Sequence, residues 1–367
     1  MIFLMVVSFG IALVASAVLI RWARSHAEHY EDDKPQRFHT GAVPRLGGLG
    51  LLIGMLSAWI VAAWSVTGWE VLNTNLGWTA VAAWAALVLP SVLGGAYEDE
   101  TQRLAVRYRL GLTAMSAALA CWLLGLSVAR LGLPGIDAML TAFPWLGVAF
   151  AIFAICGLPH AFNIIDGYNG LAGTVALLIG LALAHVALQL GDRQLAAVVL
   201  CMVGATAGFL VWNYPRGLIF AGDGGAYLWG VVIAVVSIAL VQRHDQVSPW
   251  FPMLLLIYPV WETVFSIYRK LARGVSPSVA DALHFHQLIY RRIVRGVFHD
   301  DGSRRMLMRN NRTSPYLWGF TLLTVVPAVL FWNNTAVLMI FCTLFSVTYV
   351  VAYLMLVRFK VPRWLRR

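Results

Sequence analysis

Charged residues are scarce in this sequence. Of 367 residues only 12% are Asp, Glu, Lys or Arg, whereas 60% are hydrophobic and the mean hydropathy is +0.75. A soluble domain carries about 25% charged residues, and no stretch long enough for a large soluble domain is free of apolar runs. Such a domain is therefore excluded. Repeated apolar runs near the ~20 residues that cross a bilayer predict an all-α polytopic membrane protein.

Cysteine is also scarce, and its placement excludes two kinds of site. The four cysteines lie inside apolar runs and show neither a CxxC pair nor the spacing of metal ligands. This pattern favours buried reduced thiols over disulfides or a metal centre. The residues are Cys121, Cys156, Cys201 and Cys342.

About eleven spans are expected, with the N-terminus periplasmic and the C-terminus cytoplasmic. No basic residue precedes the first run, unlike in a cleaved signal peptide, so this run is expected to remain as a span. In this orientation 24 of the 27 Lys and Arg face the cytoplasm, and only Arg130, Arg193 and Arg243 do not. The positive-inside rule gives the same orientation. The expected spans are 2–20, 46–66, 79–96, 110–129, 144–162, 170–190, 195–213, 225–242, 250–268, 316–333 and 335–357.

The net charge of +10 then lies on one face of a single integral membrane domain, 1–367. It fits a topology signal with attraction to anionic lipid, worth about 1 kcal/mol per residue. It equally fits a surface that gathers phosphorylated substrates. Nucleic-acid binding is not expected, because no soluble basic fold is present. The functional cytoplasmic loops are expected at about 21–45, 97–109, 163–169, 214–224 and 269–315.

The loop FAGDGGAY predicts a magnesium–diphosphate site at Asp223, which lies at the expected start of a helix. A helix N-terminus offers N–H groups to an anion, and glycines let a ligand approach the backbone. A carboxylate there repels phosphate unless a divalent cation bridges them, and Mg²⁺ is held by one or two carboxylates plus phosphate oxygens. A helix N-cap is the alternative role for Asp223.

Two further segments carry charge that suits phosphorylated ligands. The segment EDETQRL contains three adjacent acids, Glu98, Asp99 and Glu100. Their negative charges repel one another unless a cation or an arginine neutralises them. The alternative to a ligand site is a solvated cluster that caps the helix. In HFHQLIYRR, His284 and His286 would converge on a diphosphate in an extended segment, since positions i and i+2 do not share a helix face. Zinc is the rival ligand of this segment, although no cysteine accompanies the pair, and two interfacial histidines in a long loop are the structural alternative. Its two arginines are Arg291 and Arg292.

Two further segments carry polar residues where a predicted span begins or ends. In AVPRLGGLG, Arg45 precedes a glycine pair, which fits either an anion site close to the backbone or a close helix crossing. In FNIIDGYNGLAG, Asn163, Asp166 and Asn169 recur at intervals of three. Amide groups are poor Mg²⁺ ligands and suit a nucleobase or ribose better.

In this order the motifs resemble those of the polyprenyl-phosphate N-acetylhexosamine-1-phosphate transferases. PRLGG, NIIDGYNGLAG, FAGDGGAY and HFHQL are similar to the family's PRxGG, NxxDGx[DN]GLA, FxGDxGS and HxHH stretches, over about residues 35–295. The eleven-span topology resembles the WecA branch more than the MraY branch. The family's paired aspartates appear as GAYED, or one residue later as Asp99 and Glu100. Gln287 and Ala226 replace a usual His and Ser.

The resemblance implies magnesium-dependent transfer, with Mn²⁺ as an alternative metal, of a sugar 1-phosphate from a UDP-N-acetylhexosamine to undecaprenyl phosphate. It implies the bacterial inner membrane, a site facing the cytoplasm, and the loop 269–315 selecting the sugar. Membrane lipid is a further partner, and a homodimer is one option for the oligomeric state. The implied catalytic residues are Asp99, Glu98, Asp223, His284 and His286, with Asp223 and Asp99 on the metal. The implied substrate-binding residues are Arg45, Asn163, Asp166, Asn169, Arg291 and Arg292.

Two other functions stay open at this point. A transporter of an anionic solute would use charges inside the membrane, and Glu262 within YPVWETVF is its candidate residue. Packing against Arg269 or Tyr258 is the structural alternative for Glu262. An inactive scaffold of the same fold is the second alternative, because Glu98 replaces an aspartate.

Overall fold

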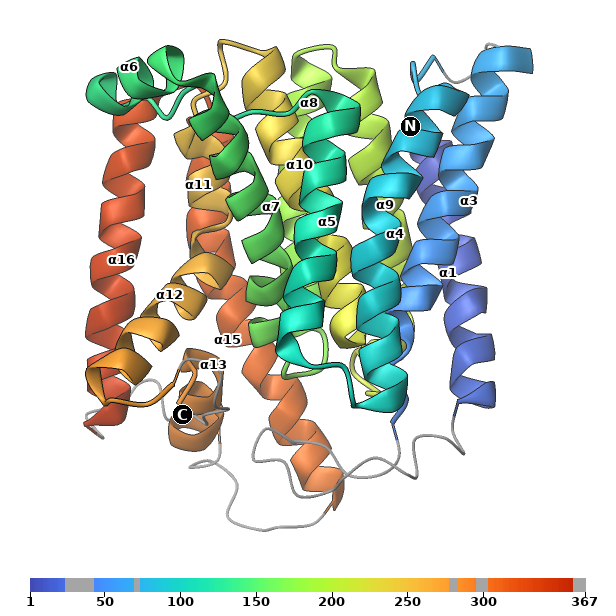
Figure 1. Ribbon diagram of the computed structural model, residues 1–367. Coiled ribbons are helices and arrows are strands. Elements are labelled where there is room, and N and C mark those ends of the chain that lie inside the picture. Colours follow the sequence, from blue (N-terminus) through green and yellow to red (C-terminus); the bar gives the residue numbers. More distant parts are fainter. Residues whose placement is uncertain (24–42, 69–72, 277–282, 295–302, 359–367) are drawn as a thin grey trace.

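The computed structural model describes residues 1–23, 43–68, 73–276, 283–294 and 303–358. Within these ranges the chain folds into helices and contains no strand, as the sequence predicts (Figure 1). The elements are α1 (Ile2–Trp22), α3 (Gly47–Gly68), α4 (Trp78–Thr101), α5 (Val106–Leu124), α6 (Pro134–Ala142), α7 (Pro144–Ile165), α8 (Leu171–Gln189), α9 (Arg193–Asn213), α10 (Gly222–Arg243), α11 (Trp250–Leu255), α12 (Ile257–Ala272), α13 (Phe285–Ile289), the π-helical turn η1 (Tyr290–Val294), α15 (Ser303–Leu330) and α16 (Thr335–Val357).

In the described ranges, nine helices are long and apolar enough to cross a membrane: α1, α3, α4, α7, α8, α9, α10, α15 and α16. This makes the chain a multi-pass membrane protein. Helix α5, expected as a span at 110–129, runs beside α4 along the bundle but begins with VRYR and is not one of the nine (Figure 1). The short helix α6 lies in a segment where the sequence predicted no element.

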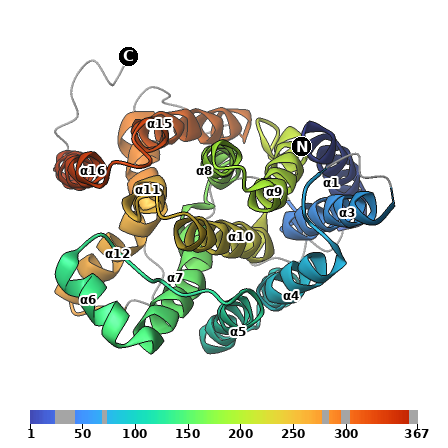
Figure 2. The ribbon, with the colours of Figure 1, turned by 90° about the horizontal axis from the view of Figure 1, so that it is seen from above.

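Helix α10 forms the centre of the bundle and is surrounded by α3, α4, α7, α8 and α9 (Figure 2). It is buried on all sides rather than along one stripe, as expected of a helix that is hydrophobic all round. Trp229 in its middle donates to Thr206 of α9 at 2.9 Å. A central helix held on every side provides a rigid support for the residues at its N-terminal end.

Small residues set the close packing of α1 against its neighbours. Gly204 and Gly208 of α9 form a GxxxG pair, and a Cβ on either would meet the backbone of α1. Gly50 and Gly54 of α3 repeat this arrangement against Ser16 and Ala12 on another side of α1. In lipid, small residues allow backbones to approach and dispersion contacts to form.

The expected span 250–268 is not one helix: the chain breaks at Leu256, between α11 and α12. Pro259 lies in the first turn of α12, and its ring nitrogen cannot donate the hydrogen bond that would continue α11. Helix α12 then runs obliquely to α11 (Figure 1). Beyond its first turn it buries Glu262, Ser266 and Arg269 and exposes apolar side chains such as Val264 and Leu271. This arrangement is typical of a helix that borders lipid.

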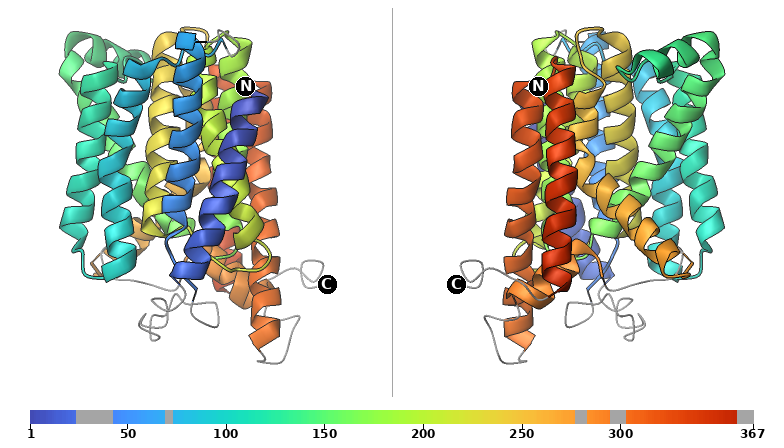
Figure 3. Two further views of the ribbon diagram at one scale, coloured as in Figure 1. Left: turned by 90° about the vertical axis from the view of Figure 1, so that its right-hand side faces the viewer. Right: turned by 90° about the vertical axis from the view of Figure 1, so that its left-hand side faces the viewer.

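The segments that carry the motifs come together at one end of the bundle. Helices α4 and α7 end there, and α3 and α10 begin there (Figure 1). Helix α15 is longer than the span expected at 316–333, and its first turns extend past the other helices (Figure 3). The expected loops 21–45 and 269–315 lie partly outside the described residues. The basic tail 359–367 lies wholly outside them.

Candidate active site

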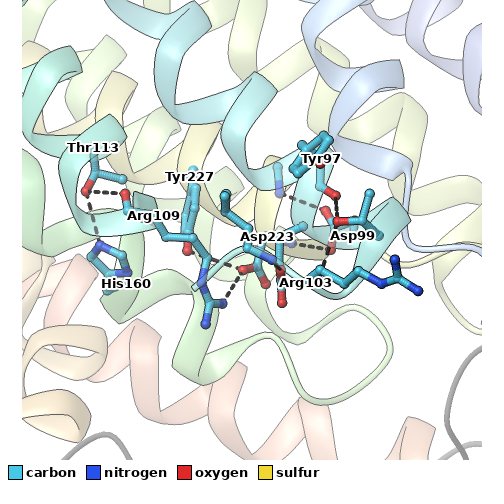
Figure 4. Close-up of polar contacts among 12 residues, drawn as sticks. Tyr97, Asp99, Arg103, Arg109, Thr113, His160, Asp223 and Tyr227 are labelled. Atoms are coloured by element: carbon cyan, nitrogen blue, oxygen red, sulfur yellow. Dashed lines mark hydrogen bonds and ion pairs between the residues drawn. The ribbon is translucent and has the colours of Figure 1, made fainter. Parts of the chain in front are cut away.

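The first turn of α10, which presents Asp223, is held by a carboxylate from another helix (Figure 4). Asp99, near the end of α4, accepts hydrogen bonds from the backbone N–H groups of Asp223 and Gly224, one to each oxygen and both at 2.9 Å. Asp99 is only 5% exposed. The first N–H groups of a helix lack partners within the helix, and negative charge is favourable at its positive end. Asp99 therefore fixes the backbone that carries Asp223.

This contact changes three expectations drawn from the sequence. The N–H groups of Asp223 and Gly224 are used by Asp99, so they are not left for a phosphate. The N-cap of α10 is Ala221, so Asp223 does not have the alternative N-cap role. Asp99 was expected on the metal, whereas both of its oxygens are engaged with the α10 backbone. In this structure Asp99 acts on the site through Asp223.

Asp223 forms an ion pair with Arg109 of α5, which was not among the expected site residues. Arg109 Nη1 donates to Asp223 Oδ2 at 2.8 Å, and the hydroxyl of Tyr227 donates to the same oxygen at 3.3 Å (Figure 4). The side chain of Asn163, at the end of α7, lies near the Tyr227 hydroxyl. The side chains of Arg109 and Asp223 are 23% and 17% exposed. The pair can therefore be reached from solvent.

Asp166, directly after α7, is a second carboxylate beside Asp223. Its carboxylate lies near the backbone N–H of Gly222, the residue before Asp223. Burial of the carboxyl and the charge of Asp223 raise the pKa of Asp166 to about 7, against the opposing effect of Arg45 and Gly222. Two carboxylates that oppose each other's ionisation are stabilised by a nearby cation. Asp166 and Asp223 thus form the electrostatic centre of the cluster.

The PRLGG stretch docks on the loop before α10 through its backbone. Gly47 and Gly48 donate to the carbonyls of Phe220 and Ala221, and Phe220 donates to that of Pro44, each at 2.9 Å. A Cβ on Gly48 would lie 2.5 Å from the carbonyl carbon of Gly224. Of the two alternatives for this stretch, the structure shows the close crossing. Arg45 is near enough to Asp166 to affect its charge.

The three adjacent acids at the end of α4 have different surroundings. Glu98 Oε2 accepts from the backbone N–H of Leu104 at 2.7 Å and so closes the turn after the helix. Asp99 is buried, whereas Glu100 is exposed. Both alignments include Asp99, the only buried acid of the three. In the structure Glu98 contacts a turn of its own loop.

The rings of the two histidines lie side by side, although the segment that carries them is not extended throughout as expected. His284 is extended and precedes α13, whereas His286 lies within it. Their rings are parallel, with centroids 5.5 Å apart. His286 packs edge-on against Tyr168 at 5.6 Å, and a Cβ on Gly167 would lie 3.2 Å from His286 Nε2. Two motifs 120 residues apart therefore meet at the loop after α7.

Asn169 was expected to contact uridine, but the structure buries it beneath α15. Its backbone N–H donates to Asn310 Oδ1 at 2.8 Å, and its side-chain Nδ2 donates to Asn311 Oδ1 at 2.9 Å. Its carbonyl accepts from the hydroxyl of Ser314 at 2.6 Å. Asn169 is 1% exposed. Asn169 therefore joins the 166–170 loop to α15. No pattern in the sequence predicted this contact.

Two expected arginines and one unexpected histidine lie near the segments that carry Asp166 and Asp223. Arg291 and Arg292 lie on η1, and Arg291 is close enough to Tyr168 to affect its charge. His160 of α7, which sequence reasoning missed inside an apolar run, lies 3.1 Å from the hydroxyl of Thr113 and packs edge-on against Tyr227 (Figure 4). This contact ties α5, and hence Arg109, to α7.

Fold and site together define a multi-pass membrane protein with a cluster of carboxylates and arginine at one end. The sequence model of glycosyl transferase family 4 matches residues 78–241. The phospho-N-acetylmuramoyl-pentapeptide-transferase of Synechococcus sp. (strain JA-3-3Ab) is 30% identical over 298 residues, which are 76% of this chain and 83% of the relative. The chain belongs to glycosyl transferase family 4.

Two further relatives are named as undecaprenyl-phosphate N-acetylglucosaminyl 1-phosphate transferases. The Yersinia pestis undecaprenyl-phosphate alpha-N-acetylglucosaminyl 1-phosphate transferase is 25% identical over 273 residues, 71% of this chain and 69% of the relative. A Bacillus subtilis (strain 168) protein named "Probable undecaprenyl-phosphate N-acetylglucosaminyl 1-phosphate transferase" is 27% identical over 271 residues, 73% of this chain and 71% of the relative. The family expected from the motifs is confirmed.

Proposed function

We propose that this protein transfers an N-acetylhexosamine 1-phosphate from a UDP-sugar to undecaprenyl phosphate and releases UMP. The product would be the first lipid-linked intermediate of a cell-envelope glycan. The relatives support a sugar 1-phosphate transfer to a polyprenyl phosphate. The observation that carries the proposal is the Asp223–Arg109 pair beside Asp166. A site that brings two phosphorylated substrates together needs such positive and cation-binding groups.

The residues present fit a magnesium ion held mainly by its substrate. Among the residues that the structure describes, no group of three or more His, Cys, Asp or Glu forms a metal-binding arrangement. Mg²⁺ commonly takes one or two carboxylates and completes its shell with phosphate oxygens and water. Asp223 would hold the ion, and the raised pKa of Asp166 supports a need for further positive charge beside it. When bound, Mg²⁺ would neutralise phosphate charge during transfer.

In the proposed reaction an oxygen of the lipid phosphate attacks the β-phosphorus of the UDP-sugar. The bond from that phosphorus to the oxygen bridging the two phosphates breaks, and UMP leaves with this oxygen. A phosphate monoester has a second pKa of ~6 and is largely dianionic at neutral pH, so direct attack needs no strong base. Arg109 would neutralise charge on the transferred group. Asp223 would hold the Arg109 side chain in place, and Asp99 would hold the backbone of Asp223.

The other groups would bind the donor. We assign the diphosphate to the histidine and arginine segment and the uridine to the end of α7. Because 24 of 27 basic residues lie in segments predicted to be cytoplasmic, the site would face the cytoplasm across the bacterial inner membrane. The assigned residues are His284, His286, Arg291 and Arg292 for the diphosphate, and Asn163 and Asp166 for the uridine.

The test uses purified protein in detergent with undecaprenyl phosphate, Mg²⁺ and a panel of UDP-hexosamines. We expect UMP release with at least one donor, and loss of this release with EDTA or in Asp223→Asn. The matched control is Asp245→Asn, which changes a carboxylate at the opposite end of α10. No UMP from folded protein with any donor, or full activity in Asp223→Asn, would contradict the proposal.

A further inference from the structure

We propose that Glu262 of α12 is a positioning residue that holds the His284–His286 pair against the loop after α7. This inference rests on the proposed function, in which the two histidines bind the donor diphosphate. Glu262 belongs to neither the expected site residues nor the Asp223 cluster. Its link to the site is a set of short contacts with the segment that carries both histidines.

Glu262 is 1% exposed, and its carboxylate joins three segments. Oε1 lies 3.0 Å from His284 Nδ1 and accepts the backbone N–H of Phe285 at 2.9 Å. Oε2 accepts the hydroxyl of Tyr349, on α16, at 2.8 Å. A buried carboxylate is costly unless its oxygens are hydrogen-bonded. Here both oxygens are bonded, and two of the three donors belong to the residues at the start of α13.

The contact with Glu262 fixes the orientation of the His284 ring and favours one of its tautomers. An ionised carboxylate only accepts hydrogen bonds, so Nδ1 of His284 carries the proton and Nε2 lies on the far side of the ring. The backbone of His284 is fixed as well, because its N–H donates to Gln287 Oε1 at 3.1 Å. Gln287, which replaces a histidine of the family pattern, thus closes the first turn of α13.

The orientation of His284 is passed to His286 by direct packing. The two rings are parallel within 1°, with centroids 5.5 Å apart. On its other side His286 meets the loop after α7, where Tyr168 packs edge-on against it. Glu262, His284, His286 and this loop therefore form one continuous set of contacts. A shift at Glu262 would move both imidazoles relative to Asp166 and its neighbours.

The break between α11 and α12 allows α12 to place Glu262 beside the segment that carries the histidines. Helix α12 turns its polar side, with Glu262 and Ser266, toward the protein and leaves Val260 and Val264 exposed. Because all three of its contacts end within the protein near one end of the bundle, Glu262 does not line a transport pathway. Its hydrogen-bond partners are His284, Phe285 and Tyr349, and Tyr258, one of the two neighbours expected from the sequence, lies close enough to interact with its charge. The reason to assign this residue to transport is thereby removed.

The experiment measures kcat and KM for donor and acceptor in wild type, Glu262→Gln, Glu262→Ala and Thr263→Ala. Glutamine keeps an acceptor for His284 and Phe285, so we expect activity close to wild type. Alanine leaves the histidines unheld, and a misplacement of about 1 Å can cost about 100-fold in rate. We expect that loss, with a raised KM for the UDP-sugar and an unchanged KM for the lipid. Thr263, whose hydroxyl bonds Pro259 within α12, is the matched control.

A double-mutant cycle tests the route of the effect. If Glu262 acts through His284, Glu262→Ala adds little to the loss already caused by His284→Ala. Thermal unfolding in detergent identifies folded variants; if the alanine variant does not fold, Glu262→Asp, which withdraws the carboxylate by one methylene, replaces it. A folded variant with unchanged kinetics, or a fully additive cycle, overturns this inference alone. An inactive wild type overturns the proposed function and the inference with it.

Discussion

Gly95→Ala should disable the site although it replaces no charged residue. Gly95 lies on α4, where this helix crosses the first turn of α10. A Cβ added there would lie 2.6 Å from the carbonyl carbon of Asp223 and 2.6 Å from Gly224 Cα, and it would also press on the Gly224 nitrogen. All three atoms belong to backbone, so no flexible side chain can move away.

The size of the displacement follows from these distances. An ordinary contact begins at about 3.4 Å, so α10 must shift by about 0.8 Å (3.4 minus 2.6) relative to α4. That shift would stretch the 2.9 Å bonds from Asp99 to the N–H groups of Asp223 and Gly224. Each bond to a charged group contributes about 1.5–3 kcal/mol. A misplacement of about 1 Å at a catalytic group costs about 100-fold in rate.

Gly94→Ala is the matched control, because a Cβ on this neighbouring residue would meet the side chain of Leu112. A side chain can rotate away, and alanine improves helix propensity by about 1 kcal/mol. The assay is the rate of UMP release, with thermal unfolding in detergent to confirm folding. We expect near-normal rates for Gly94→Ala and about 100-fold lower rates for Gly95→Ala. Equal rates in the two variants would refute the role of this crossing.

Three further predictions concern charge and chemistry. Arg109→Ala should lower kcat by about 100-fold or more, and Arg109→Lys should recover part of it because one charge remains; normal kcat in both would exclude the clamp. The folded pKa of Asp166, about 7, exceeds its ordinary value of 3.8, so the charged form destabilises the fold fully above pH 7 and less as pH falls toward 4. Asp166→Asn should therefore raise Tm most at pH 8 and least near pH 5, and a pH-independent difference would contradict this. With labelled UDP-sugar and no acceptor lipid, no phosphoryl-enzyme should accumulate; trapping one on Asp223 or Asp99 would replace direct attack by a covalent route.

The helical membrane fold and the positions of the polar motifs could be predicted from the sequence, because both depend on local patterns of residues. The apolar runs gave the all-helical membrane fold, because a bilayer requires long continuous helices. The motif residues Asp223, Asp166 and His286 were found because each lies in a polar interruption of an apolar sequence. Their convergence at one end followed from the alternation of spans.

Other features required distances between helices that no local pattern contains. Asp99 was recognised as functional, but its role as a cap of α10 depends on the crossing at Gly95. Asn169 was assigned to uridine because an amide group suits a nucleobase or ribose better than Mg²⁺, whereas α15 covers it through Asn310 and Asn311. The span at 250–268 was drawn as one helix because the apolar run continues through Pro259.

The most direct test of the account follows the β-phosphorus of the donor. UDP-N-acetylhexosamine labelled with ³²P at the β-position is incubated with the protein, Mg²⁺ and undecaprenyl phosphate, and the lipid fraction is separated from the nucleotides. The account predicts that the label moves to the lipid as unlabelled UMP forms, and that Asp223→Asn prevents this. Label that stays in UDP while the sugar moves to the lipid, or transfer unaffected in Asp223→Asn, would contradict it.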